Sequence, residues 1–186
     1  MTRQFAHIAT AVLCAGLLAG CAGTGGHRDW TRYVDKTLNF EISYPTGWVS
    51  KSYQPTVSEV EEVRHDENSK IILIGITIPP DTVRDSKLSR FSSVQVQFLP
   101  DAACERARQA AHATEKSGGM EYAVSHQDNV DDRYDVTSYL VLNGRYCLAV
   151  YDLVRFDNGP RDSIPASAFK SLRAKLENVR KTFALH

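Results

Sequence analysis

The chain has 186 residues, a length that suits one domain with its own apolar core. It carries 22 basic and 22 acidic residues. This balance excludes the strong positive field that is typical of nucleic-acid-binding proteins, and it gives no indication of a site that attracts an acidic substrate over long range.

The first 20 residues have the pattern of an export signal. Arg3 and the free amine form a small positive region, and residues 8–18 are apolar or small throughout. A helix needs about 20 apolar residues to cross a hydrocarbon core, so this stretch is too short to span a bilayer. It matches the apolar part of a secretory signal, and we expect residues 1–20 to be removed.

The four residues Leu18-Ala19-Gly20-Cys21 follow directly and resemble the lipobox of bacterial lipoproteins. The resemblance implies cleavage between Gly20 and Cys21, and acyl chains such as palmitate on Cys21, which together hold a protein stably at a bilayer. Ala22 stands where lipoproteins kept in the inner membrane usually carry Asp, which implies the outer membrane with the domain facing the periplasm. The alternative is an ordinary signal peptide in which Cys21 is incidental.

Residues 21–31 are rich in glycine and predict a short flexible tether. Residues 32–186 predict the folded domain. Trp30 and Tyr33 stand at the junction of the two parts. We expect both rings to pack against the first strands, and the alternative is a contact with the membrane.

The first half of the domain has the pattern of strands separated by turns. Leu38, Phe40 and Ile42 alternate with polar residues, which is the period of a half-buried strand. Pro45-Thr46-Gly47 has the composition of a turn. The segments that follow predict a returning strand at 48–53, a connector or exposed helix at 54–68, an Ile-rich central strand at 70–78 and another strand at 92–99.

The next segments predict a helix and a strand. Asp101 is a suitable N-cap for a helix over residues 102–116. The pair Gly118-Gly119 then ends that helix. Residues 120–126 predict a strand.

The clearest local signal is a β-hairpin. Residues 134–142 and 145–155 are alternating runs joined at Asn143-Gly144. Asn-Gly between such runs predicts a type I′ turn, in which both turn residues have a positive φ.

The C-terminal segment predicts an amphipathic helix over residues 165–185. Its apolar side chains recur at steps of three and four. They are Phe169, Leu172, Leu176, Val179 and Phe183. The opposite face carries Lys170, Arg173, Lys175, Arg180 and Lys181, which we expect to face water; contact with anionic lipid or a partner is the alternative.

Cys104 and Cys147 predict a disulfide, because a pair of cysteines in an oxidising periplasm is expected to be oxidised. The bond would close a loop of about 43 residues and contribute about 4 kcal/mol in the chain-entropy account. Two buried free thiols are the alternative. Neither cysteine has a second Cys or His close by, as a zinc site requires.

These elements predict an α+β domain, with an antiparallel sheet of about six or seven strands, two helices packed on it and no internal repeat. The segment Asn39-Phe-Glu-Ile-Ser-Tyr-Pro-Thr-Gly-Trp48 resembles the opening strand pair of the PsbP-like superfamily, whose members often begin with f-x-i-x-Y-P-x-x-W. The closing helix near Phe183 is similar too. Over residues 32–185 the resemblance implies an α/β/α sandwich around a curved antiparallel sheet.

The PsbP-like superfamily consists mostly of non-enzymatic proteins, namely photosystem subunits, assembly helpers and envelope lipoproteins. The resemblance therefore implies a binding or assembly role, and this chain shows none of the context of a photosystem subunit. Fold alone does not fix a function.

No residue pattern in the sequence indicates a catalytic site. The sequence contains no nucleophile elbow, phosphate loop, dinucleotide fingerprint or H-E-x-x-H motif. His65-Asp66-Glu67 is expected to be a solvated loop. The acidic residues Asp128, Asp131, Asp132 and Asp135 lack the spacing of a calcium loop. We expect no catalytic residue, metal or cofactor.

The sequence thus predicts a lipid-anchored, non-catalytic binding or assembly module of the bacterial envelope, with an unidentified envelope protein as partner and no nucleic acid. Two other functions stay open. One is a small-ligand or metal-binding lipoprotein with a pocket between sheet and helices, and the other is an envelope hydrolase.

Overall fold

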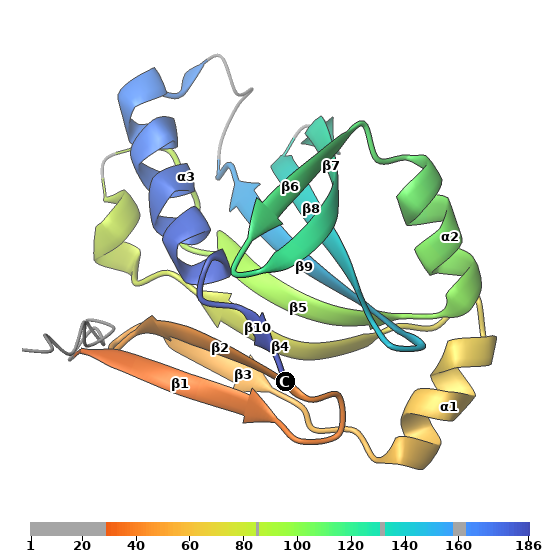
Figure 1. The fold of residues 1–186 in the computed structure, drawn as a ribbon. Helices are drawn as coiled ribbons and strands as arrows, with labels where there is room; N and C mark the ends of the chain where they lie inside the picture. Colours follow the sequence, from red (N-terminus) through yellow and green to blue (C-terminus); the bar gives the residue numbers. More distant parts are fainter. Residues whose placement is uncertain (1–28, 85, 131–132, 158–162) are drawn as a thin grey trace, which may run out of the picture.

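The structure is a computed structural model that describes residues 29–84, 86–130, 133–157 and 163–186, which form two antiparallel sheets and three α-helices (Figure 1). The strands are β1 (Trp30–Asp35), β2 (Phe40–Pro45), β3 (Val49–Ser52), β4 (Ile71–Thr77), β5 (Ser93–Leu99), β6 (Ala113–Ser117), β7 (Met120–Val130), β8 (Tyr134–Asn143), β9 (Tyr146–Arg155) and β10 (Ala184–Leu185). The helices are α1 (Val57–His65), α2 (Asp101–Gln109) and α3 (Ala166–Arg180), with a 3-10 turn at Pro80–Val83. The predicted α+β class is confirmed.

The large sheet has seven strands in the order β3-β4-β5-β9-β8-β7-β6. Figure 1 shows α3 and the small sheet on one side of it, and α1 beside α2 at one end. The two faces are covered by different groups. Leu148 and Val150 of β9 belong to the main core with α3, whereas Cys147 and Ala149 belong to a smaller cluster beneath α2. Strand β9 is therefore buried on both faces, which explains its nearly continuous apolar sequence.

Strands β2 and β3 do not pair with each other, although the sequence suggested that residues 48–53 return beside the first strand. Strand β2 lies between β1 and β10 in a three-stranded sheet, with Phe40 opposite Leu185. Strand β3 pairs with β4, with Val49 opposite Thr77. Both edges of β2 are occupied, so the chain after the Pro45–Trp48 turn joins the other sheet. Strand β1 begins at Trp30, inside the segment assigned to the tether, and Trp30 and Tyr33 pack against the core as expected.

The region after Pro55 forms helix α1. Of the two predictions for residues 54–68, a connector or an exposed helix, the helix is therefore the correct one. The Thr56 hydroxyl accepts from the backbone N–H of Glu59, and the Glu59 carboxylate accepts from the backbone N–H of Thr56. This reciprocal capping box satisfies two donors at the helix start. The hydrogen bond from Tyr53 helps to lower the pKa of Glu59 to about 2.

The helix predicted for residues 102–116 is too long. Helix α2 ends at Gln109, and its N-cap is Pro100 rather than Asp101. Residues 113–117 form β6, which pairs with β7, and Gly118-Gly119 is the turn between these two strands rather than a helix end. Both glycines have a positive φ, +59° and +79°. The free edge of β7 thus determines the conformation of a segment whose local sequence favours helix.

This turn gives a first testable prediction. Gly119→Ala is expected to lower the free energy of unfolding by about 1–2 kcal/mol, because a side chain raises the energy of the left-handed conformation. No heavy atom lies within 4 Å of the added Cβ, so the cost is conformational. Urea denaturation measures it. Gly75→Ala in β4 is the control, since Gly75 lacks a positive φ and its added Cβ makes only an ordinary contact; equal losses in both variants would contradict the turn.

The predicted β8–β9 hairpin is confirmed, but its turn differs. Asn143 still pairs with Tyr146, so the two-residue loop is Gly144-Arg145, and of these only Gly144 has a positive φ. This pattern fits a type II′ turn, not type I′. The Asn143 amide instead donates to the backbone oxygen of Leu38 at 2.8 Å, a tertiary contact that fixes the residue in the strand.

Helix α3 is shorter than predicted, because it ends at Arg180 and residues 184–185 form β10. Phe183 lies beyond the helix but is still buried in the core, where its ring lies 5.4 Å from that of Phe40. Thr182 donates to the backbone oxygens of Ser43 and Val179. The C-terminus is thus turned back onto β2.

Candidate functional site

The N-terminal predictions lie outside the described residues. They comprise the signal peptide of residues 1–20, the cleavage site at Gly20, the lipid-bearing Cys21 and the first part of the tether. Within the described residues, no helix is long and apolar enough to cross a membrane.

The predicted disulfide is present between Cys104 of α2 and Cys147 of β9, with their Cα atoms 6.0 Å apart. Leu99, Leu140 and Ala149 surround it in the smaller apolar cluster. The side chains that α2 packs against this cluster are small, namely Ala103, Cys104 and Ala107. The helix itself therefore buries little apolar area, and the disulfide bond holds it on the sheet.

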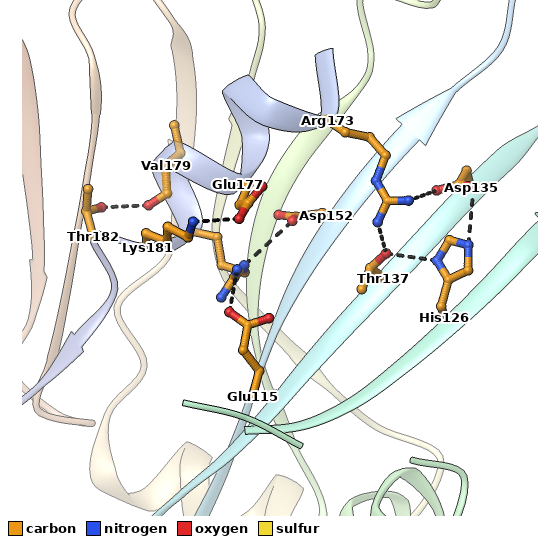
Figure 2. Close-up of polar contacts among 11 residues, drawn as sticks. Glu115, His126, Asp135, Thr137, Asp152, Arg173, Glu177, Val179, Lys181 and Thr182 are labelled. Carbon is orange, nitrogen blue, oxygen red and sulfur yellow. Dashed lines mark hydrogen bonds and ion pairs between the residues drawn. The ribbon is translucent and has the colours of Figure 1, made fainter. Parts of the chain in front are cut away.

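Arg180 is buried, although the sequence placed it on the solvent face of the last helix. Its side chain is 1% exposed. The guanidinium donates to Glu115 of β6 at 2.9 Å, lies 3.8 Å from Asp152 of β9, and stands 3.8 Å above the ring of Tyr139 on β8. Figure 2 draws the two ion pairs as dashed lines that end on the labelled carboxylates of Glu115 and Asp152. One cation thus joins α3 to three strands of the sheet.

The Asp152 carboxylate is the most perturbed acid in this group. Burial raises its pKa to about 7, and the nearby Arg180 opposes part of that rise. Within the described residues, no group hydrogen-bonds to Oδ1 of Asp152 or to Nε of Arg180. Burial also raises the pKa of Tyr139 to about 12. The pair is therefore only partly compensated, and removal of either member changes the stability of the fold.

A second polar group surrounds Arg173, which precedes Arg180 by seven residues on α3 (Figure 2). His126 and Thr137 are opposite each other on β7 and β8. Nδ1 of His126 lies 2.9 Å from Oγ1 of Thr137, and Nε2 lies 2.8 Å from Asp128. Arg173 of α3 donates to Thr137 at 3.0 Å and lies 4.0 Å from Asp135, which is 1% exposed.

This second group contains the residue types of a nucleophilic triad and also those of a metal site. Hydroxyl, imidazole and carboxylate stand in the order of a nucleophile, its base and an orienting acid. However, Thr137 is buried and its oxygen already accepts from Arg173. His126, Asp128 and Asp135 could also hold a metal ion, because one ligand atom from each lies within 4.8 Å of the others. Of the acidic cluster considered from the sequence, the structure brings Asp128 and Asp135 together, while Asp131 and Asp132 lie outside the described residues.

A pocket of about 840 Å³ opens between the end of α2 and the sheet. Its wall comes from α2, residues 111–112, β6, β7, β8 and Leu185 of β10. The apolar lining residues are Ala111, Ala113, Met120, Ala123, Leu140, Val141, Leu142 and Leu185, and the polar ones are Glu105, Arg108, Gln109, His112, Thr114 and Glu121. The volume falls in the range of small-molecule sites.

Sequence reasoning missed the buried ion pair, although the sequence contained a signal for it. Asp152 occupies an inward position of β9, in phase with Val150 and Val154. Arg180 lies four residues after Leu176, on the apolar stripe of α3. Two opposite charges at two core positions indicate a buried pair. The pocket had no such signal, because its walls come from segments far apart in the sequence.

Comparisons with known proteins show likeness in structure but not in sequence. No protein-family model matches the chain, and no curated protein matches it. Among solved structures, the chain is similar to the solution structure of cyanobacterial PsbP (CyanoP) from Synechocystis sp. PCC 6803. The identity is 17%, the TM-score is 0.47, and the alignment covers 92% of this chain and 100% of that one.

Proposed function

We propose that this chain is a lipoprotein of the bacterial envelope. Acyl chains on Cys21 hold it at the outer membrane, and its domain, which we assign to the PsbP-like superfamily, binds another envelope component without catalysing a reaction. The observation that carries the proposal is the segment Leu18-Ala19-Gly20-Cys21, placed directly after an apolar stretch too short to span a bilayer.

Two features of the domain support a binding role in the periplasm. The Cys104–Cys147 disulfide fits an oxidising compartment. Thr137 supplies the hydroxyl that lies beside the imidazole of His126. This hydroxyl is buried beneath α3 and accepts a hydrogen bond from Arg173. A substrate cannot reach this oxygen unless α3 moves, so the group is better suited to holding the helix than to nucleophilic attack.

The anchor gives a second prediction. Cells that express the full chain and receive labelled palmitate are expected to yield a labelled protein in the membrane fraction. Cys21→Ser is expected to lose the label and to leave that fraction, because the serine oxygen is not the nucleophile that takes the lipid.

Cys14→Ser is the matched control, since Cys14 lies within the apolar stretch and is removed with the signal. It is expected to keep both label and location. A Cys21→Ser protein that still sediments with membranes, or a mature N-terminus whose mass shows no acyl chain, would overturn the anchor. For the binding role, crosslinking in intact cells followed by mass spectrometry is expected to recover one recurring envelope component; repeated recovery of the chain alone counts against it.

A second candidate function, small-ligand binding, is favoured by the pocket beside α2. Its volume of about 840 Å³ and its mixed apolar and polar lining are those of a ligand site. This function is compatible with the anchor, because a tethered domain can bind a small molecule as well as a protein.

A further inference from the structure

Part of the pocket wall consists of small side chains, namely Ala111, Ala113 and Ala123. The disulfide fixes the first turn of α2 to β9, and the helix presents Ala103 and Ala107 to the sheet. After Gln109 the chain crosses to the edge of the sheet, where the backbone N–H of His112 donates to Val124. This crossing contributes Ala111 and Ala113 to the wall. Methyl groups leave the space in front of the sheet open.

The floor of the pocket is aliphatic. Leu140 and Leu142 lie two residues apart on β8, and Ala123 lies opposite Leu140 on β7. Leu140 is 4% exposed, whereas Leu142 is 52% exposed. A large apolar side chain is thus partly open to solvent beside a buried one. Met120 and Leu185 extend the apolar lining. A ligand that covers Leu142 gains the free energy of removing that area from water.

The rim carries balanced charges. Glu105 pairs with Arg108 at 3.4 Å, and Glu121 pairs with Lys116 at 3.5 Å. Each acidic group of the rim therefore has a cation beside it. Gln109, Thr114 and His112 add hydrogen-bond donors and acceptors. This rim can hydrogen-bond a polar head group, but it supplies no net field that selects an anion or a cation.

The lining is poorly suited to flat aromatic ligands. Among the described residues that form it there is no Phe, Tyr or Trp. Nucleobases and other flat rings are usually held by stacking on such side chains. The flexible apolar side chains of the lining, such as Met120, can instead adapt to the aliphatic chain of a ligand.

We propose that this pocket binds the aliphatic chain of an amphiphile whose polar head group has no net charge. The chain lies against Leu140 and Leu142, and the head group lies at the rim near Gln109 and Thr114. The proposal rests on the binding role proposed above and names its ligand class. It does not depend on the lipid at Cys21.

The experiment uses the chain from Ala22 to His186, which keeps all the described elements, and isothermal titration calorimetry with monomeric lysophosphatidylethanolamine. Saturable binding of one molecule per chain is expected. Leu142→Ser is expected to weaken binding about fivefold, because it removes part of the apolar area that the ligand covers. Ile72→Ser is the matched control, since Ile72 is 47% exposed and lies on β4, away from the pocket.

A second variant fills the space. Ala113 is exposed on the edge strand β6, so Ala113→Trp is expected to leave the fold intact and to weaken binding more than tenfold. Palmitate, an anion with an aliphatic chain, is expected to bind more weakly than the zwitterionic probe. No saturable binding, an equal loss in Ile72→Ser, or tighter binding of palmitate would overturn the proposal. Release of the Cys21→Ser protein from membranes tests the anchor separately.

Discussion

Replacing Cys104 and Cys147 together with serine is expected to lower the free energy of unfolding by about 4 kcal/mol. The bond spans a sequence separation of 43 residues, and its loss returns the conformational freedom of that loop to the unfolded chain. The native state loses a further restraint, since the helix that the bond attaches packs small side chains against the sheet. Urea denaturation monitored by circular dichroism measures the change.

Reductant provides the control for this prediction. The wild-type protein unfolded in the presence of a reductant is expected to show the lowered stability of the double variant, because both then lack the bond. The double variant is expected to be insensitive to reductant. A wild-type protein whose unfolding midpoint does not move on reduction would show that the disulfide contributes little to stability.

Replacing Arg180 with methionine is expected to destabilise the fold by about 3–5 kcal/mol at pH 8. The change removes the cation next to Asp152, which is 7% exposed, and leaves that carboxylate buried without its partner. Lys181→Met, at the C-cap of the same helix, is the matched control. The Lys181 side chain is 50% exposed and its partner Glu177 is 45% exposed, so its loss is expected to cost about 1 kcal/mol or less. Equal losses in the two variants would contradict the account of Arg180.

The pH dependence of this effect follows from the pKa of Asp152. Burial raises that pKa from an ordinary value near 3.8 to about 7 in the folded protein. The folded state therefore binds a proton more tightly than the unfolded state, and stability falls as pH rises from about 4 to about 7. Asp152→Asn is expected to remove this pH-dependent loss of stability. The variant is therefore expected to be more stable than the wild type at pH 8 and equally stable near pH 4.

The double variant Arg180→Met, Asp152→Asn tests whether the two charges act as a pair. It is expected to recover most of the stability lost in Arg180→Met at pH 8, because no buried carboxylate is then left uncompensated. If Asp152→Asn changes the stability by the same amount with and without Arg180, the two charges do not act as a pair, and Arg180 acts through Glu115 or Tyr139 instead.

Local sequence predicted the elements whose conformation depends on near neighbours. The alternating runs of β8 and β9 require only each other and a short turn, so their hairpin was correctly predicted. The capping box at Thr56 satisfies the start of α1 from within the helix. The disulfide was predicted from the number of cysteines and from the predicted periplasmic compartment, and residues 104 and 147 are indeed joined. The sequence also supplied the whole basis for the proposed anchor at Cys21.

Tertiary contacts decided the elements that local sequence assigned wrongly. Residues 113–117 have a helical composition but form β6, because the free edge of β7 offers a ladder of backbone hydrogen bonds that an isolated helical end lacks. Helix α3 ends early since the residues after Arg180 pair with β2. The prediction placed Arg180 in solvent only because its side chain is charged, whereas the structure buries it.

By itself, the sequence determined the α+β class, the main hairpin, the disulfide and an N-terminal segment typical of lipoproteins, because each of these depends on periodicity, turn chemistry or residue type. Only the tertiary structure decided that β2 and β3 belong to different sheets, that Arg180 and Asp152 meet in the core, and that the end of α2 and the sheet enclose a pocket. These features join residues far apart in the chain, and their free energy comes from packing and burial that no local pattern records.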